Sequence, residues 1–196
     1  MEPLRHPGGQ MVGLRVLGPV EVEADGTSVN VGGPTQRRLL AALAVNVNSV
    51  VSTAALVDAV WDGAPPEGVS RGFKSYVGRL RGALKDGGAP SVITTHPSGY
   101  ALEVDRSSID ATRFESLVDQ AGSATNMGEP QRALEVLEEA LALWRGPAYG
   151  EFASEPWARA AAARLQEMEA VAQERRMEAL LAVGRSDRLL PQIEAL

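Results

Sequence analysis

The sequence predicts an α+β domain followed by an all-α domain. Two observations carry this prediction. Up to about residue 105, short stretches with the two-residue period of β-strands lie on both sides of three stretches with helical periodicity. Beyond that point, the apolar residues have helical spacing throughout. We therefore expect a disordered lead-in over residues 1–12, an α+β domain over residues 13–105 and a helical domain over residues 106–196.

The first ordered segments are typical of a small antiparallel sheet. Residues 20–23 and 28–31 alternate apolar and polar side chains, which is the period of a half-buried strand. Asp25-Gly26 between them is a favoured hairpin turn, because glycine tolerates positive φ. With residues 14–17 as the first strand, three strands are predicted.

Three helices are expected next. Pro34 suits the first helical position, where its missing N–H costs nothing, and Ser52 is a good N-cap for the second helix. Pro65-Pro66 follows that helix and forces a loop. The third helix covers residues 68–85, with apolar side chains spaced four, four, three and four residues apart. They are Val69, Phe73, Val77, Leu80 and Leu84.

A second hairpin closes the α+β domain. Residues 92–95 and 100–102 are short apolar runs joined by His96-Pro97-Ser98-Gly99, in which proline and glycine favour a turn. The sheet, the three helices and this hairpin together can enclose one core, so we expect the α+β domain to fold without the rest of the chain.

Helices with apolar stripes make up the second half of the chain. Asp110 is a candidate cap for the first, Pro130 opens the second, a third opens near Pro156, and Ser186 caps a fourth. Paired amphipathic helices are typical of tetratricopeptide-like (TPR-like) hairpins, although no strict repeat is visible. The fourth helix is short and would leave its apolar stripe uncovered, so we expect a truncated chain or a partner on that face.

Charge is distributed unevenly along the chain. The formal net charge of −6, taken alone, disfavours a nucleic-acid partner. Residues 1–105 carry nine Lys/Arg against ten Asp/Glu, which is −1, and residues 106–196 carry ten against fifteen, which is −5. Residues 68–85 hold five basic side chains and no acidic one. Because the apolar stripe of this helix faces the core, its other face is basic and suits the DNA major groove. A merely solvated face would usually mix both signs.

Other kinds of site are disfavoured. The chain has no cysteine, and its two histidines lie far apart without companion ligands, so we expect no metal site and no cofactor. No nucleophile has an evident base partner, which argues against an enzyme. Gly32-Gly33-Pro34 has neither the spacing nor the lysine of a phosphate-binding loop. With no secretory signal and no long apolar span, a cytoplasmic protein without membrane contact is expected.

Residues 14–104 resemble the OmpR-type winged helix-turn-helix domain, in which a sheet precedes three helices and a hairpin wing. The matching segments are Gly33-Pro34 through Leu43, Leu56 to Trp61 with the Pro-Pro loop that follows, Tyr76 to Arg81, and Gly99-Tyr100. The chain from Asp110 onward resembles the bacterial transcriptional activation domain, notably over residues 133–147. Together the two resemble the Streptomyces antibiotic regulatory protein (SARP) family over nearly the whole chain.

The resemblance implies a sequence-specific DNA-binding transcriptional activator that binds direct repeats in promoter DNA, recruits RNA polymerase holoenzyme and often controls a secondary-metabolite (antibiotic) gene cluster. In the helix, the matching positions for bases or phosphates are Arg71, Lys74, Ser75, Arg79 and Arg81, with Arg81 on the DNA backbone. In the wing they are His96, where the family usually carries an arginine nearby, and Ser98. The polymerase-contacting loop corresponds to Asp62, Gly63, Pro65, Pro66 and Glu67.

Two further expectations concern partners. A winged helix is asymmetric and the chain lacks an evident coiled-coil element, so self-association is expected as a head-to-tail tandem dimer on DNA, at the nucleoid. The alternative from a different class is a helical-repeat adaptor that binds only proteins and uses the α+β domain as a scaffold. A salt-sensitive gel shift with promoter DNA separates the two.

Overall fold

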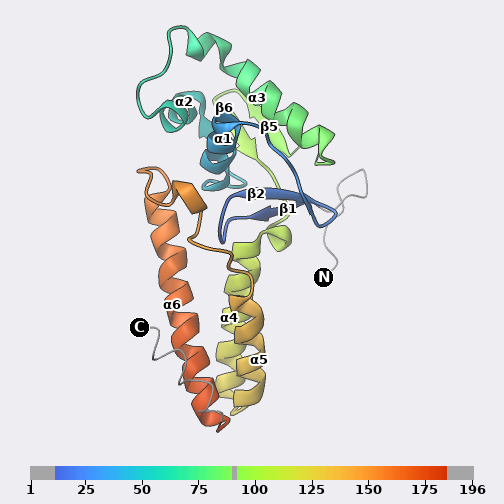
Figure 1. The fold of residues 1–196 in the computed structure, drawn as a ribbon, viewed down its shortest axis with the longest axis vertical. Coiled ribbons are helices and arrows are strands. Elements are labelled where there is room, and N and C mark those ends of the chain that lie inside the picture. The colour runs from blue at the N-terminus through green and yellow to red at the C-terminus, as the bar shows by residue number, and fades with distance from the viewer. Residues whose placement is uncertain (1–11, 90–91, 185–196) are drawn as a thin grey trace.

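The structure, a computed structural model, describes residues 12–89 and 92–184. Figure 1 shows the α+β part at one end of an elongated molecule and a group of long helices at the other. The first strand begins at Val12, the last residue of the predicted lead-in. The rest of that prediction, and the predicted fourth helix of the second half, lie outside the described residues.

The first sheet confirms the predicted antiparallel hairpin arrangement. Its strands are β1 (Val12–Arg15), β2 (Glu21–Ala24) and β3 (Thr27–Ser28), in that order and antiparallel throughout. Asp25 and Gly26 connect β2 to β3 with φ angles of 50° and 78°. Positive φ at both central residues matches the right-handed twist of the flanking strands, as the Asp-Gly pair predicts. β3 ends at Ser28, earlier than its alternation predicts.

The three helices of the α+β part are α1 (Pro34–Ala44), α2 (Thr53–Trp61) and α3 (Val69–Asp86). Pro34 opens α1, as predicted. Ser52 caps α2, since its Oγ accepts a hydrogen bond of 3.1 Å from the N–H of Ala55. The three predicted helices are thus confirmed, and α3 begins and ends one residue later than predicted.

The second sheet contains the predicted hairpin and one strand that the sequence did not reveal. The hairpin strands are β5 (Ile93–His96) and β6 (Gly99–Leu102), and β4 (Val51–Ser52) pairs with the other edge of β6. A Cβ atom at Gly99 would lie 1.9 Å from the carbonyl oxygen of Val51. Only glycine therefore lets β4 approach β6 so closely.

The second half is helical, as predicted. A short 3-10 turn, η1 (Arg106–Ser108), leads into α4 (Asp110–Asn126), which forms a hairpin with α5 (Pro130–Leu141). After a second 3-10 turn, η2 (Gly150–Phe152), the long helix α6 (Arg159–Ala182) packs against α5. Figure 1 shows these three helices side by side. Asp110 is the first residue of α4, with Ile109 in the N-cap position, so the helix begins one residue earlier than predicted.

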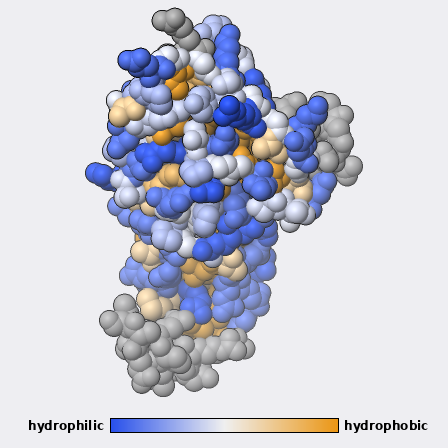
Figure 2. All heavy atoms as spheres, turned by 45° about the horizontal axis from the view of Figure 1, so that its top comes forward, coloured by the Kyte–Doolittle hydropathy of each residue, from blue (hydrophilic) through white to orange (hydrophobic). Residues whose placement is uncertain are grey.

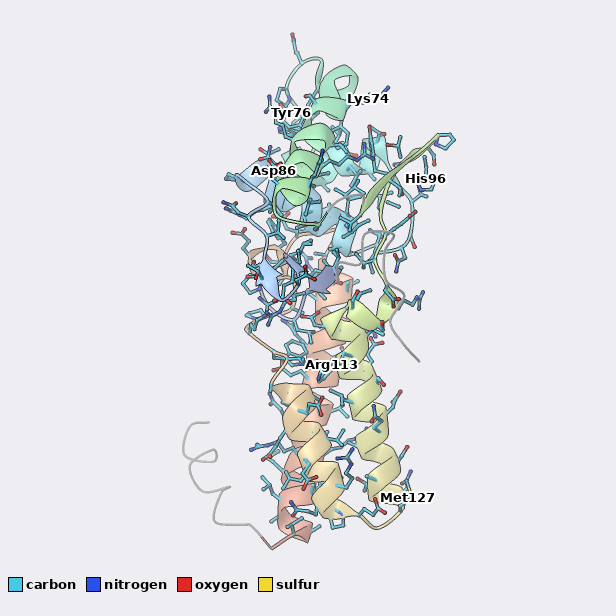
Figure 3. The ribbon with its side chains drawn as sticks, turned by 90° about the vertical axis from the view of Figure 1, so that its right-hand side faces the viewer. Lys74, Tyr76, Asp86, His96, Arg113 and Met127 are labelled. Carbon is cyan, nitrogen blue, oxygen red and sulfur yellow. The ribbon has the colours of Figure 1, made fainter. Side chains whose placement is uncertain are left out.

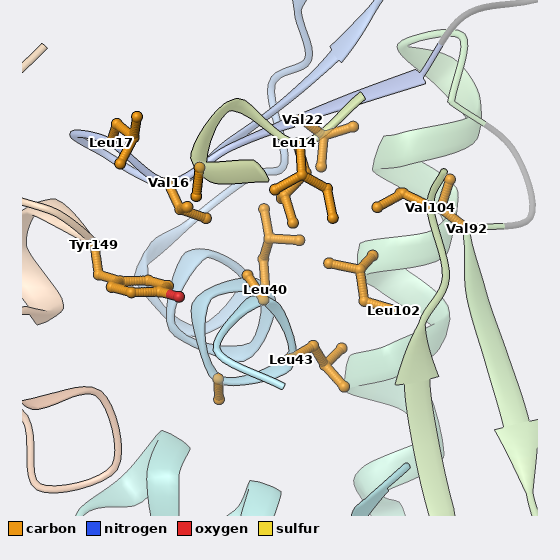
Figure 4. Close-up of a cluster of buried hydrophobic side chains, with 14 of the residues drawn as sticks. Leu14, Val16, Leu17, Val22, Leu40, Leu43, Val92, Leu102, Val104 and Tyr149 are labelled. Carbon is orange, nitrogen blue, oxygen red and sulfur yellow. The ribbon is translucent and has the colours of Figure 1, made fainter. Parts of the chain in front are cut away.

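The hydrophobic core runs without interruption from the α+β part into the helical part. The predicted inward stripe of α3 is buried, with every member at most 6% exposed. Figure 4 shows Leu14 of β1 close to Leu40 of α1, with Tyr149 of the helical part on the same cluster. Leu14 also forms a bridge with Ile109 at the start of α4. The division near residue 105 therefore passes through a shared core.

Hydrogen bonds reinforce the seam between the two parts. The seam consists of the β1–β2 connection and the residues of the helical part that bond to it, which are Asp110, Arg145 and Tyr149. The carboxylate of Asp110 accepts from the N–H groups of Val16 at 2.8 Å and Leu17 at 3.1 Å. In return, the carbonyl oxygen of Val16 accepts from Tyr149 N, and that of Leu17 from Arg145 N. Burial raises the pKa of Asp110 above its usual value, while these hydrogen bonds and the nearby Arg145 oppose the shift.

Candidate nucleic-acid interface

Helix α3 lies across the end of the molecule farthest from the α4–α6 bundle (Figure 1). Its apolar stripe faces inward, so its other face is turned to solvent. Figure 2, in which this end comes forward, shows a mostly hydrophilic surface with small apolar patches. The structure thus presents α3 at a free end of the molecule, as a recognition helix requires.

Three basic side chains on this face are exposed: Lys74, Arg79 and Lys85. Within the part of the chain that the structure describes, none of them forms an ion pair. The guanidinium of Arg79 lies 5.5 Å over the ring of Tyr76, a cation–π contact that orients it without neutralising its charge. Figure 3 labels Lys74 near the outer end of α3. Positive charge is therefore available on this face for an anionic partner.

Of the remaining predicted residues of α3, the structure describes the side chain of Ser75 but not that of Arg71. Ser75 is exposed, and its hydroxyl donates to the carbonyl oxygen of Gly72 at 2.7 Å, which leaves the hydroxyl oxygen free to accept. Arg71 belongs to α3, but its side chain lies outside the described residues. The glycines at 72, 78 and 82 have no atom within 4 Å of an added Cβ, so packing within the protein does not require glycine there.

The β5–β6 hairpin forms a wing that projects beside α3 (Figure 3). Ser98 is exposed at its turn. His96 is half-buried and turned along the hairpin, with Nε2 3.0 Å from Thr94 Oγ1 and 3.4 Å from a carboxylate oxygen of Glu103. Thr94 Oγ1 also donates to Glu103. Glu103, which sequence reasoning did not single out, therefore engages the one ring expected to reach DNA from the wing.

Arg81 differs from the other basic residues of α3 because it bonds to the wing. Its Nε and Nη2 donate to the carbonyl oxygen of Ile93 at 3.1 Å and 2.9 Å, and Nη2 also donates to Thr95 Oγ1 at 2.8 Å. Its guanidinium lies 5.9 Å over the ring of Tyr100. The sequence placed Arg81 at the edge of the basic face but showed none of these contacts.

The loop between α2 and α3 is exposed at every predicted position. Asp62 ends α2 in the left-handed conformation, with φ of 53°, and Gly63 follows with φ of 73°. Gly63 and the prolines stop the helix, as predicted, and Asp62 is a C-cap that the sequence did not reveal. The exposed members of the loop are Asp62, Gly63, Pro65, Pro66 and Glu67.

A metal site and a membrane span are both missing from the residues that the structure describes. Among the residues that the structure describes, no group of three or more His, Asp or Glu side chains could hold a metal ion. None of the described helices combines the length and the apolar character of a membrane span.

Comparison with known proteins matches each half of the chain to a family. Residues 27–102 match the family described as "Transcriptional regulatory protein, C terminal", and residues 109–196 match the "Bacterial transcriptional activator domain". Residues 103–108, between the α+β part and the helical part, separate the two matches.

Individual relatives extend over nearly the whole chain. The transcriptional regulatory protein MoaR1 of Mycobacterium tuberculosis is 35% identical over 94% of this chain and 60% of its own length. The transcriptional regulator RedD of Streptomyces coelicolor is 32% identical over 99% of this chain and 56% of its own length. The regulatory protein DnrI of Streptomyces peucetius is 33% identical over 93% of this chain and 70% of its own length.

A solved structure agrees with the fold. Mycobacterium tuberculosis EmbR, determined in complex with a low-affinity phosphopeptide, matches with a TM-score of 0.84 and 31% identity over 95% of this chain and 50% of that chain. The chain thus spans about half to two thirds of the length of most of these relatives. With both domains matched in order and relatives similar over nearly all its residues, the chain belongs to the Streptomyces antibiotic regulatory protein family of transcriptional regulators.

Proposed function

We propose that this chain is a sequence-specific transcriptional activator that inserts α3 into the major groove of promoter DNA. The observation that carries the proposal is the exposed basic face of α3, where Lys74 and Arg79 are held at the free end of the molecule. Arg79 has the planar fork that pairs with both acceptors of a guanine edge, whereas Lys74 suits a phosphate as a point charge. Arg71 and Ser75 complete the proposed contacts on α3, and Ser98 and His96 those of the wing.

The helical part serves, in this proposal, as the effector that engages RNA polymerase holoenzyme. Its sequence charge of −5 disfavours a second DNA surface, because it would repel phosphates. Exposed apolar side chains on this part offer surface for a protein partner. They are Met127, Val171, Met177 and Leu181. The loop over residues 62–67 is a second polymerase contact, and an antibiotic gene cluster is the proposed target. The same apolar surface is also compatible with the alternative, an adaptor that binds only proteins. A demonstration that the chain binds DNA would exclude that alternative.

Salt dependence tests the proposed DNA binding directly. The logarithm of the association constant for promoter DNA is expected to fall linearly with the logarithm of salt concentration, with a slope of about −0.9 per phosphate contact. Lys74→Ala is expected to reduce the slope by about one contact, for all DNA sequences alike. Fluorescence anisotropy over a salt series measures both. Arg132→Ala, at an exposed position of α5, is the matched control and should leave the slope unchanged. Equal slopes for the two variants would remove Lys74 from the interface.

The glycine at position 78 gives a prediction in which stability and binding move in opposite directions. Gly78 lies on the exposed face of α3, and an added Cβ would meet no protein atom within 4 Å. Gly78→Ala is therefore expected to raise the free energy of unfolding by about 0.5–1 kcal/mol. If α3 approaches the floor of the groove closely, the same methyl group should weaken DNA binding. Urea unfolding measures the stability of the variant, and fluorescence anisotropy measures its DNA affinity. A variant that gains both stability and affinity would show that α3 does not approach the floor of the groove closely at this position.

Tandem binding on direct repeats predicts a dependence on helical phase. Two copies placed head to tail on one face of the duplex require repeat centres about one helical turn apart, near 10–11 base pairs. Inserting about half a turn between the repeats should abolish cooperative binding while leaving single-repeat affinity intact. A gel-shift titration of both DNAs measures this. Cooperativity that survives the insertion would indicate a flexible or a symmetric dimer.

A further inference from the structure

Arg81 connects the two elements that the proposed function places on DNA. Three hydrogen bonds of 2.8–3.1 Å join its guanidinium to Ile93 and Thr95 of β5, and the same group stacks over Tyr100 of β6. The Nε–H and both protons of Nη2 are used by these bonds, which leaves only Nη1 for another partner. Three of the five N–H donors of this side chain thus bond to other residues of the protein.

The acceptors of these hydrogen bonds are the carbonyl oxygen of Ile93 and the hydroxyl oxygen of Thr95, both on β5. Among the strands that the structure describes, β5 lies at the edge of its sheet and pairs with β6 alone. The N–H of Glu103 bonds to the carbonyl oxygen of Val92, so the next carbonyl along the chain, that of Ile93, points away from β6. Arg81 supplies two donors to this carbonyl and a third to Thr95. A lysine, with a single ammonium centre, cannot reproduce that fork.

We infer that Arg81 is a positioning residue that holds the wing at a fixed angle to α3, and that it is not a phosphate contact. The inference rests on the proposed function, because the angle matters only if α3 and the wing meet the same DNA. It departs from the role that family resemblance implies for this position. Arg81 thus differs from Lys74 and Arg79, which are exposed and have no ion pair with any residue that the structure describes.

The two roles predict different responses to Arg81→Ala and Arg81→Lys. The salt slope counts phosphates that Lys or Arg neutralise. The turn of the wing carries no Lys or Arg, so loosening the wing should not change the slope. Arg81→Ala is therefore expected to weaken binding about tenfold, through the loss of hydrogen bonds from a charged group, while the salt slope stays as in the wild type. Arg81→Lys should resemble Arg81→Ala. A slope reduced by about 0.9 in Arg81→Ala and restored in Arg81→Lys would identify a phosphate contact and overturn the inference.

The partner on the wing provides a cycle that does not depend on charge. Thr95→Val removes the acceptor hydroxyl at nearly constant volume and is expected to weaken binding severalfold in the wild type. In the Arg81→Ala background the same change should have no further effect, because the bond is already absent. Independent, additive losses would show that the two residues act separately, which contradicts the inference.

Amide hydrogen exchange in the free chain separates this inference from the proposed function. Arg81→Ala and Thr95→Val should both accelerate exchange in β5 and β6 and leave α6 unchanged. If the wild type fails to bind DNA but these variants loosen the wing, the proposed function is wrong and the positioning contact stands. If exchange in the wing is unaffected by both substitutions, Arg81 does not hold the wing, whatever the chain binds.

Discussion

A chain shortened to residues 1–107 is expected to lose its cooperative fold. The contacts across the seam are the reason for this prediction, which differs from the expectation from sequence. Leu14, Val16 and Leu17 are at most 2% exposed, and they contact or bond to residues after 107. Returning each side chain to water costs about 1.5–3 kcal/mol. Val16 and Leu17 would also lose their hydrogen bonds to the Asp110 carboxylate, and each hydrogen bond to a charged group contributes about 1.5–3 kcal/mol relative to bonding with water.

These losses together are comparable with the entire stability of a small domain, which is about 5–15 kcal/mol. Urea unfolding followed by circular dichroism, with the 196-residue chain as reference, measures the outcome. Asp110→Ala provides a milder version, because it removes only the acceptor and should lower the unfolding free energy by a fraction of the truncation's effect. Asp110→Asn, which keeps an acceptor, should be milder still. A shortened chain that unfolds cooperatively at the midpoint of the full chain would show that the seam contributes little.

Arg79→Ala is expected to give the largest loss of DNA affinity among single substitutions on α3. A bidentate contact between arginine and guanine is worth about 1–3 kcal/mol of discrimination, or roughly 5- to 150-fold. Binding should weaken at the preferred site and the preference at one base pair should relax, while fully non-specific DNA binds with a slope reduced by at most one contact. Anisotropy with a set of single-base-pair variants of the site measures both quantities.

Two companion variants sharpen this prediction. Arg79→Lys keeps the charge but lacks the planar fork, so it should retain the salt slope and still lose base preference. Tyr76→Phe keeps the ring under the guanidinium and should bind as the wild type does. If Arg79→Ala left affinity and base preference unchanged, the recognition face would have been assigned to the wrong side of α3.

Local patterns account for the parts of this fold that were predicted. The stripe on α3, the cap at Ser52 and the Asp25-Gly26 turn each depend on residues close together in sequence, so periodicity and turn preferences suffice to find them. β4 was missed because it has only two residues and is defined by its pairing with β6. Its residue Val51 pairs with Tyr100, which is nearly fifty residues away along the chain. Pairing at that separation leaves no local signal.

Side-chain contacts between distant segments explain the remaining differences. Asp110 has the sequence signature of a cap, yet its carboxylate accepts from Val16 and Leu17, and this contact fuses the two predicted domains. Arg81 has the signature of a DNA contact, yet its donors point to Ile93 and Thr95. A sequence pattern reveals which face a residue occupies, but not which distant acceptor its side chain meets.

Methylation protection of guanine N7 tests the central claim most directly, because this atom lies in the major groove. With the full chain bound to promoter DNA that carries direct repeats, guanines on one face of each repeat are expected to be protected from methylation. The Arg79→Ala chain, at a concentration that restores occupancy, should lose protection at one guanine per repeat and keep the rest. Binding that leaves every guanine as reactive as in free DNA, or no binding at low salt, would contradict a major-groove role for α3.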